Sequence, residues 1–359
     1  MKRLVVVATA VLSSSFAAFA QGPHDTSSDW AKANLAKSPR HGEYVSIKEP
    51  SGRVLQAWVV YPEIKSKAPV VVMIHEIFGQ SDWAREMADE VAAAGYIVVE
   101  PDLLSGFGPA PTAAQMTMPS TAAYQTAGAE NSQELQEKLK RMTLAGMGCD
   151  PMDCAPGQKP LLQPVAYAPQ QQQASPMDHM HMEAANSGVA FVPTSPGGTA
   201  AFPDQSAVVK AVSSLDPAIV TADLDAAADY GKKQAAANGK LYVVGVCGGG
   251  GKSFAFATHR KDLSGAFVFY GPPPPAEAMK NITAPVYGFY AGNDARITAT
   301  IPQTTIDMKA AGKKYDPVTY DGAGHGFMRA GEAPDSSAEN AAARAAGFRR
   351  LIDLLGGMH

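Results

Sequence analysis

The chain has 359 residues, of which 46% are apolar and 18% charged, which is enough apolar material for one large hydrophobic core or two modest ones. Its formal net charge of -4 and isoelectric point near 6.1 provide no basic field for a polyanion, so the composition argues against a nucleic-acid partner. The apolar fraction also argues against a chain that is disordered throughout.

The N-terminus has the three parts of a secretory signal. Residues 1–3 are Met-Lys-Arg, residues 4–12 are apolar, and residues 18–20 form the small-x-small pattern of a cleavage site. A membrane anchor would need about 20 apolar residues, and the serines at 13–15 interrupt this run. We therefore expect residues 1–20 to be a signal peptide, the mature protein to be periplasmic or secreted, and no membrane span to remain after cleavage.

Strand-like and helix-like segments alternate from residue 43 to residue 102. The stretch "SDWAREMADEVAAAGY" (81–96) predicts a helix with Ser81 or Asp82 as its cap and Gly95 as its stop. Apolar or alternating runs at 43–47, 54–62, 68–76 and 96–102 predict strands around it. Strand, helix and strand with short connections indicate a parallel sheet.

The regular pattern stops near residue 105 and resumes near residue 206. The residues between are rich in Pro, Gln, Met, Ala and Gly, and "APQQQQASPMDHMHMEAANSG" (168–188) has the lowest complexity. Only residues 130–147 within this stretch have a helical pattern. We therefore predict one α/β domain over residues 21–359, interrupted at about 105–205 by a partly disordered surface insertion.

The chain contains three cysteines, Cys149, Cys154 and Cys247. In an oxidising compartment the close pair in "CDPMDC" is placed for a local disulfide, although a metal site is an alternative for the same pair. Cys247 would then be the odd thiol, either a nucleophile or a small buried apolar side chain.

The insertion also groups methionine and histidine. His179, Met180 and His181 lie together in "PMDHMHM", and thioether and imidazole ligands suit copper. The alternative is a flexible polar tract in which these residues recur by chance, so we treat them as weak metal candidates and expect no cofactor.

The α/β alternation continues to the C-terminus. Together with the first half, it predicts a mostly parallel central sheet with helices on both faces. Strands are predicted at 241–246, 264–271, 284–294 and 316–321, and helices at 221–240, 250–260, 301–313 and 338–357.

The stretch "VVGVCGGGGKSF" (243–254) fits two kinds of site. A phosphate cradle of the P-loop kind needs a glycine where the chain has Val246, so that pattern fails by one residue. A nucleophile elbow, Gly-x-nucleophile-x-Gly, is met by Gly245, Cys247 and Gly249. The elbow holds the nucleophile on a sharp turn between strand and helix, where small neighbours let the two elements pack closely.

An elbow needs an acid and a base further along the chain. Asp294 in "YAGND" and His325 in "DGAGHGF" follow in that order, each after a predicted strand. As single residues they would be read as a turn aspartate and a loop histidine, but their joint order and placement favour catalysis. We also expect the backbone N–H groups of Ile77 and Gly248 to form an oxyanion hole.

These residues resemble the dienelactone hydrolase family of the α/β-hydrolase fold, in the motifs "HEIFG", "GYIVVEPDL", "DLDAAADY", "GVCGGGG", "GNDARI" and "GHGFMR". The resemblance covers roughly residues 44–104 and 221–355. It implies a triad of Cys247, Asp294 and His325, a hydrogen bond from the resting thiol to Glu76, and a substrate carboxylate held by Arg329. It also implies hydrolysis of a dienelactone to maleylacetate.

The chain departs from the family in its export signal and its insertion. A second substrate-binding arginine of the family cannot be placed, because it would fall where the insertion begins, and Arg85 fits a helix-packing role better. We therefore expect a hydrolase of carboxylic esters or lactones that forms a thioester acyl-enzyme on a small-molecule substrate. The alternatives are an exported copper-binding protein and a non-catalytic member of the fold that only binds a ligand.

Overall fold

The computed structural model describes residues 29–109, 189–192 and 195–357. Every element below belongs to one of the two units into which the chain divides, residues 1–110 together with 179–359. The expected signal peptide (1–20), the pair Cys149 and Cys154, and the metal candidates at 179–181 lie outside the described residues.

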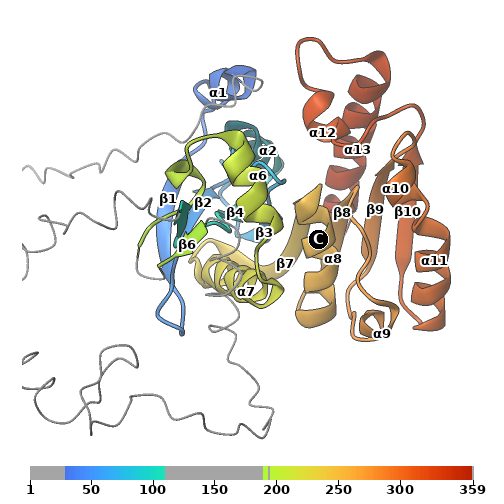
Figure 1. Ribbon diagram of the computed structural model, residues 1–359, viewed down its shortest axis with the longest axis horizontal. Coiled ribbons are helices and arrows are strands. Elements are labelled where there is room, and N and C mark those ends of the chain that lie inside the picture. The colour runs from blue at the N-terminus through green and yellow to red at the C-terminus, as the bar shows by residue number, and fades with distance from the viewer. Residues whose placement is uncertain (1–28, 110–188, 193–194, 358–359) are drawn as a thin grey trace, which may run out of the picture. The chain divides into compact units, whose positions relative to one another are not determined.

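An eight-stranded sheet is the centre of this unit. Its strands are β1 (Gly42–Lys48), β2 (Val54–Val60), β3 (Ala68–Ile74), β4 (Ile97–Pro101), β7 (Ala237–Val246), β8 (Gly265–Phe269), β9 (Val286–Ala291) and β10 (Tyr315–Tyr320). The order across Figure 1 is β1-β2-β4-β3-β7-β8-β9-β10. Each neighbouring pair from β4 to β10 in this order is parallel, whereas β2 pairs antiparallel with both β1 and β4.

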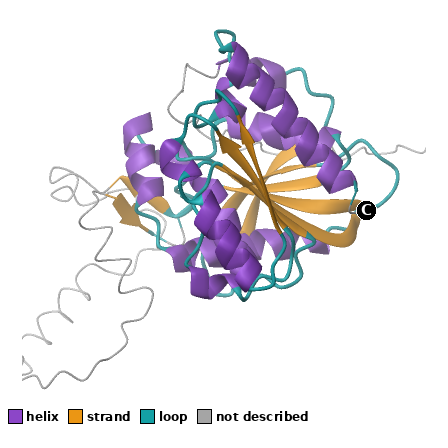
Figure 2. Cartoon of the chain, turned by 90° about the vertical axis from the view of Figure 1, so that its right-hand side faces the viewer, coloured by secondary structure: helices purple, strands orange, loops and turns teal. Residues whose placement is uncertain are grey.

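Helices cover both faces of the sheet, as Figure 2 shows. They are α1 (Asp29–Leu35), α2 (Asp82–Ala93), α6 (Gln205–Ser213), α7 (Pro217–Lys233), α8 (Gly248–His259), α9 (Ala276–Met279), α10 (Ala295–Thr298), α11 (Ile301–Ala310), α12 (Phe327–Ala330) and α13 (Ala338–Gly356). The predicted mostly parallel sheet with helices on both faces is confirmed.

The two faces follow from the alternation of side chains along each strand. Val70 and Val72 of β3 belong to one apolar cluster, together with residues of α7 and α8. Val71 and Met73 belong to the other, with residues of α2 and α13. All seven residues of β3 are buried, which explains why its sequence is continuously apolar rather than alternating.

The helix predicted over residues 221–240 is wrong at both ends. α7 begins earlier, at Pro217, because the side chain of Asp216 accepts a hydrogen bond from the backbone N–H of Ala218 and proline suits the first helical position. The helix stops at Lys233, and residues 237–240 already belong to β7.

The structure describes short segments at both ends of the predicted insertion. Strand β5 (Phe107–Pro109) pairs with β6 (Val189–Phe191), and a 3₁₀ turn, η2 (Thr199–Ala201), follows. The carboxylate of Asp102 accepts hydrogen bonds from the backbone N–H of Thr199 at 2.7 Å and from its hydroxyl at 2.9 Å. Helix α6 then precedes α7. The structure does not describe residues 110–188, so the expected interruption at about 105–205 stays a prediction.

Candidate active site

Cys247 lies at the junction of β7 and α8. β7 is a central strand of the sheet, between β3 and β8 (Figure 1). Its backbone angles are φ 54° and ψ -118°, an uncommon conformation for a residue with a side chain. A Cβ atom on Gly245 would lie 2.0 Å from the carbonyl oxygen of Gly249, and one on Gly249 would lie 2.3 Å from that of Ile74. Both glycines are therefore required by the close approach of strand and helix at this turn.

Asp294 and His325 reach Cys247 from the ends of two further strands. Asp294 follows β9 as the N-cap of α10, and His325 lies in the loop between β10 and α12. The Nδ1 atom of His325 lies 2.5 Å from Oδ2 of Asp294, and its Nε2 atom lies 3.1 Å from Sγ of Cys247. The structure thus brings the three predicted catalytic side chains into one hydrogen-bonded chain.

The protonation of His325 follows from these two contacts. The hydrogen bond with Cys247 raises the pKa of His325 to about 9, with a further contribution from Asp294, although partial burial opposes the shift. The direction of this shift favours the charged form of His325, next to the sulfur atom.

Tyr270 is a site residue that the sequence analysis missed. Its ring lies edge-on to the imidazole of His325, with 5.0 Å between ring centroids, and it is 1% exposed. Like Cys247 it has a positive φ, 39°. Its position directly after β8, at the same edge of the sheet as the other site residues, is the signal that could have found it.

The two expected oxyanion donors lie beside each other. A Cβ atom on Gly248 would be 3.2 Å from Cγ2 of Ile77, so the two residues face one space next to Cys247. Within the described part of the chain, no turn or loop hydrogen bond uses the backbone N–H of Ile77 or Gly248. The oxyanion hole expected from these two groups stays a prediction.

His75 holds this loop in place through two hydrogen bonds. Its Nδ1 atom lies 2.8 Å from the carbonyl oxygen of Glu76, and Nε2 accepts a hydrogen bond from the backbone N–H of Leu103 at 3.3 Å. Burial lowers the pKa of His75, which keeps the ring neutral so that one nitrogen donates and the other accepts.

Glu76 and Arg329 form an ion pair, with 2.7 Å between Oε1 and Nε. The Glu76 side chain is 3% exposed and that of Arg329 25%, and the guanidinium lies 4.7 Å from the ring centroid of Phe78. The resemblance implied a hydrogen bond between the resting thiol and Glu76, and a substrate carboxylate held by Arg329. In this structure the Glu76 and Arg329 side chains pair with each other, and the two implied roles stay predictions.

Arg85 lies outside this group of residues. It pairs with Asp82, and its guanidinium lies 5.6 Å from the ring centroid of Trp58 and 5.8 Å from that of Tyr44. These contacts connect α2 to β1 and β2, which is the packing role expected from the sequence.

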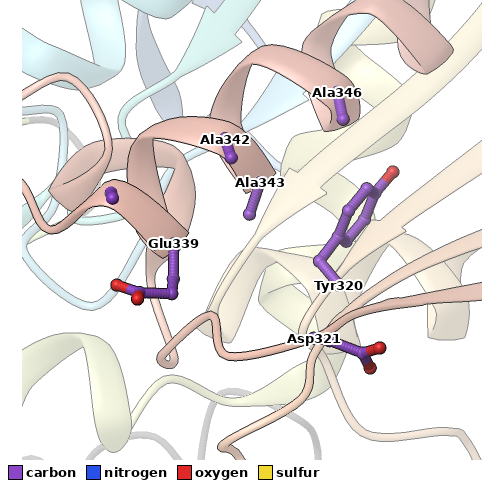
Figure 3. Close-up of a pocket in the computed structure, with 7 residues that line it drawn as sticks. Tyr320, Asp321, Glu339, Ala342, Ala343 and Ala346 are labelled. Atoms are coloured by element: carbon purple, nitrogen blue, oxygen red, sulfur yellow. The ribbon is translucent and has the colours of Figure 1, made fainter.

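An open pocket of about 440 Å³ lies between the end of β10 and α13 (Figure 3). None of the residues predicted for catalysis lines it, so we do not assign it to the substrate. Its lining residues are Tyr320, Asp321, Ala338, Glu339, Ala342, Ala343 and Ala346.

Two further findings concern only the described residues. They contain no group of three or more His, Cys, Asp or Glu side chains placed to bind a metal ion. None of their helices combines the length and the apolar composition that crossing a bilayer requires.

Comparison with known proteins gives a family and a fold. The sequence model of the dienelactone hydrolase family matches residues 55–147 and 173–358. A Methylorubrum extorquens protein provisionally named a carboxymethylenebutenolidase is 34% identical over 161 residues, which cover 42% of this chain and 54% of that protein. The chain spans about half the length of the named relatives that it matches.

Two crystal structures have a similar fold. One is a provisionally assigned dienelactone hydrolase from Klebsiella pneumoniae, with a TM-score of 0.54 and 19% identity, covering 88% of this chain and 97% of that chain. The other is a dienelactone hydrolase-like promiscuous phosphotriesterase from metagenomic libraries, with a TM-score of 0.52 and 15% identity, covering 89% of this chain and 98% of that chain. At these identities they show the fold alone, and the predicted α/β-hydrolase fold is confirmed.

Proposed function

The chain belongs to the dienelactone hydrolase family, and from this premise we propose that it hydrolyses carboxylic esters or lactones through Cys247, His325 and Asp294. The observation that carries the proposal is the continuous contact from Asp294 through His325 to Sγ of Cys247, at 2.5 Å and 3.1 Å. Nucleophile, base and orienting carboxylate in hydrogen-bond reach are the arrangement that acyl transfer requires.

In the first half of the reaction, the Cys247 thiolate attacks the ester carbonyl and forms a C–S bond. The carbonyl electron pair moves to oxygen, which accepts hydrogen bonds from the backbone N–H groups of Ile77 and Gly248. When the carbonyl re-forms, the C–O bond to the alcohol breaks, and the leaving alkoxide takes a proton from His325. The products of this step are a thioester and a neutral imidazole.

In the second half, water opens the thioester. His325 accepts a proton from the water as its oxygen attacks the thioester carbonyl, and the C–S bond then breaks. The thiolate is released beside the imidazolium, which restores the starting state. Asp294 keeps Nδ1 protonated throughout, so that Nε2 faces the sulfur and the substrate.

The substrate that we propose is a small ester or lactone carrying a carboxylate. The name of the Methylorubrum relative refers to the hydrolysis of an unsaturated lactone of this kind, and Arg329 lies near the site to receive an anion. Its pairing with Glu76 means that a carboxylate would have to compete with, or displace, that side chain. No cofactor takes part in this scheme.

The test compares variants on one ester and one carboxylate-bearing lactone. Cys247→Ala should lower kcat by about 10³-fold or more, because it removes the atom that forms the acyl-enzyme. The control is Cys149→Ala, which should keep the rate of the parent protein if the two cysteines have separate roles. Full activity in Cys247→Ala would rule out the proposed mechanism.

We also propose that the protein is exported. The support is the charged, apolar and small-residue order of residues 1–20. N-terminal sequencing of the protein from the periplasmic fraction or the medium of an expressing bacterium should find a chain that starts near Gln21. A chain that keeps Met1 and remains in the cytoplasm would contradict it.

A further inference from the structure

Lys252 lies near the start of α8, in the helix predicted over residues 250–260, and the sequence alone assigned it no role at the site. It comes four positions after Gly248, so the two residues share one face of the helix. Long helical side chains point toward the helix N-terminus, and Nζ of Lys252 accordingly lies 3.8 Å from where a Cβ atom on Gly248 would be. The ammonium group is thus next to an expected oxyanion donor, in space that the missing side chain of Gly248 leaves open.

The same space is bounded on its other side by Ile77. Its Cγ2 atom and the Lys252 ammonium are the only heavy atoms among the described residues within 4 Å of that Cβ position, apart from the chain neighbours and the helix backbone. A substrate whose carbonyl oxygen meets the N–H groups of Ile77 and Gly248 would therefore have the ammonium group beside it.

Lys252 differs from the other cations around the site in having no carboxylate to neutralise it. Within the described ranges, no ion pair or hydrogen bond joins its Nζ to another residue, whereas Arg329 is paired with Glu76 and Arg85 with Asp82. Burial lowers the pKa of Lys252, and the nearby Cys247 sulfur opposes that shift. A partly buried ammonium group that no carboxylate pairs with is stabilised when an anion binds beside it.

We propose that Lys252 is a specificity-determining residue that binds the carboxylate of an anionic ester or lactone. It would supply the second cationic contact that the sequence analysis could not place. Among the described residues, Arg329 is engaged by Glu76, whereas no carboxylate pairs with Lys252, so its ammonium group is open to an anionic part of the substrate. The inference deepens the proposed hydrolase activity and depends on it.

The test uses two esters with one leaving group and equal acyl length, p-nitrophenyl hexanoate and the mono-p-nitrophenyl ester of adipic acid. The wild type should favour the anionic ester, measured as the ratio of the two kcat/KM values. Lys252→Met should lower this ratio about tenfold or more, mainly through a higher KM for the anionic ester. Lys252→Arg should restore part of the ratio, because it keeps the charge.

The matched control is Lys309→Met, which removes an exposed lysine of α11. It makes the same change in net charge and should leave the ratio unaltered. An unchanged ratio in Lys252→Met, or an equal loss on both esters, would overturn the role in specificity. An equal loss together with a shifted pH profile would show instead that Lys252 acts on the thiol.

Failure of the hydrolase proposal has a different signature. If the wild type cleaves neither ester, or Cys247→Ala cleaves both, the proposed mechanism fails whatever Lys252 does. Calorimetric titration of adipate into Cys247→Ala then tests Lys252 without any turnover. The additional Lys252→Met change should weaken adipate binding about tenfold, and equal affinity in the two proteins would overturn the inference.

Discussion

The Nε2 atom of His325 lies 3.1 Å from Sγ of Cys247. This contact is the largest of the causes that raise the pKa of the imidazole to about 9. Cys247→Ala should therefore move the titration midpoint of His325 down toward the ordinary value of about 6.5. NMR titration of the ring carbons in wild type and variant measures both midpoints. Equal midpoints in the two proteins would show that the sulfur does not control this ionisation.

The same shift predicts how stability depends on pH. Because the folded-state pKa of His325 lies above the unfolded value, its contribution is fully present below about pH 6.5 and is lost as the pH rises through about 9. The advantage in free energy of unfolding of wild type over His325→Gln should decrease across this interval. Urea titrations at pH 6 and pH 10 check the sign, and an advantage that grows with pH would contradict it.

Arg329→Met should destabilise the protein, because it leaves the Glu76 carboxylate buried without its cation. The Glu76 side chain is 3% exposed and loses its ion pair, whereas the Arg329 side chain is 25% exposed. We therefore expect the free energy of unfolding to fall by about 2 kcal/mol, less than the ~3–5 kcal/mol lost when a fully buried pair is broken. The double variant Glu76→Gln/Arg329→Met should regain most of this loss. Urea denaturation at neutral pH measures all three proteins, and a double variant as unstable as Arg329→Met would refute the explanation.

Gly249→Ala tests the packing under the nucleophile. The new Cβ atom would lie 2.3 Å from the carbonyl oxygen of Ile74 and 2.5 Å from that of His75, and backbone atoms cannot move aside easily. We expect a loss of about 4 kcal/mol or more, or no folded protein. The control is Gly356→Ala near the end of α13, where no heavy atom lies within 4 Å and alanine should stabilise by about 0.5–1 kcal/mol.

The central part of the fold was predictable because local sequence determines it. A strand such as β3, buried over its whole length, is a continuous apolar run, and α2 carries its own N-cap in Ser81. The order of Cys247, Asp294 and His325 was predictable because each follows a strand of a parallel sheet, and such positions meet at one edge.

The rest depends on contacts between distant residues. β5 pairs with β6 across a long stretch of intervening chain, and neither short segment specifies its partner. Lys252 could be assigned to a helix, but the direction of its ammonium group depends on the bare backbone of Gly248 and on the position of Ile77. The Glu76–Arg329 pair likewise joins two motifs that were each interpreted separately.

Arg53, directly before β2, contacts the short strands β5 and β6. Its guanidinium lies 5.4 Å and 5.1 Å from the ring centroids of Phe107 and Phe191, which belong to β5 and β6. It also pairs with Asp223 of α7 at 3.0 Å and with Glu49 at 3.7 Å. Arg53 is 4% exposed and Asp223 0%, so this charge cluster is almost completely buried.

Arg53→Met should thus cost about 3–5 kcal/mol at neutral pH, because two carboxylates stay buried without their cation. Burial already raises the pKa of Asp223 well above its usual value, so the carboxyl takes up a proton readily in the folded state. The cost should therefore shrink as the pH is lowered from 7 to 5, which urea denaturation at both values can measure. Lys48→Met, which removes an exposed charge from β1, should stay within about 0.5 kcal/mol of wild type at either pH. A cost for Arg53→Met that is small, or equal at the two pH values, would show that the cluster does not depend on its arginine.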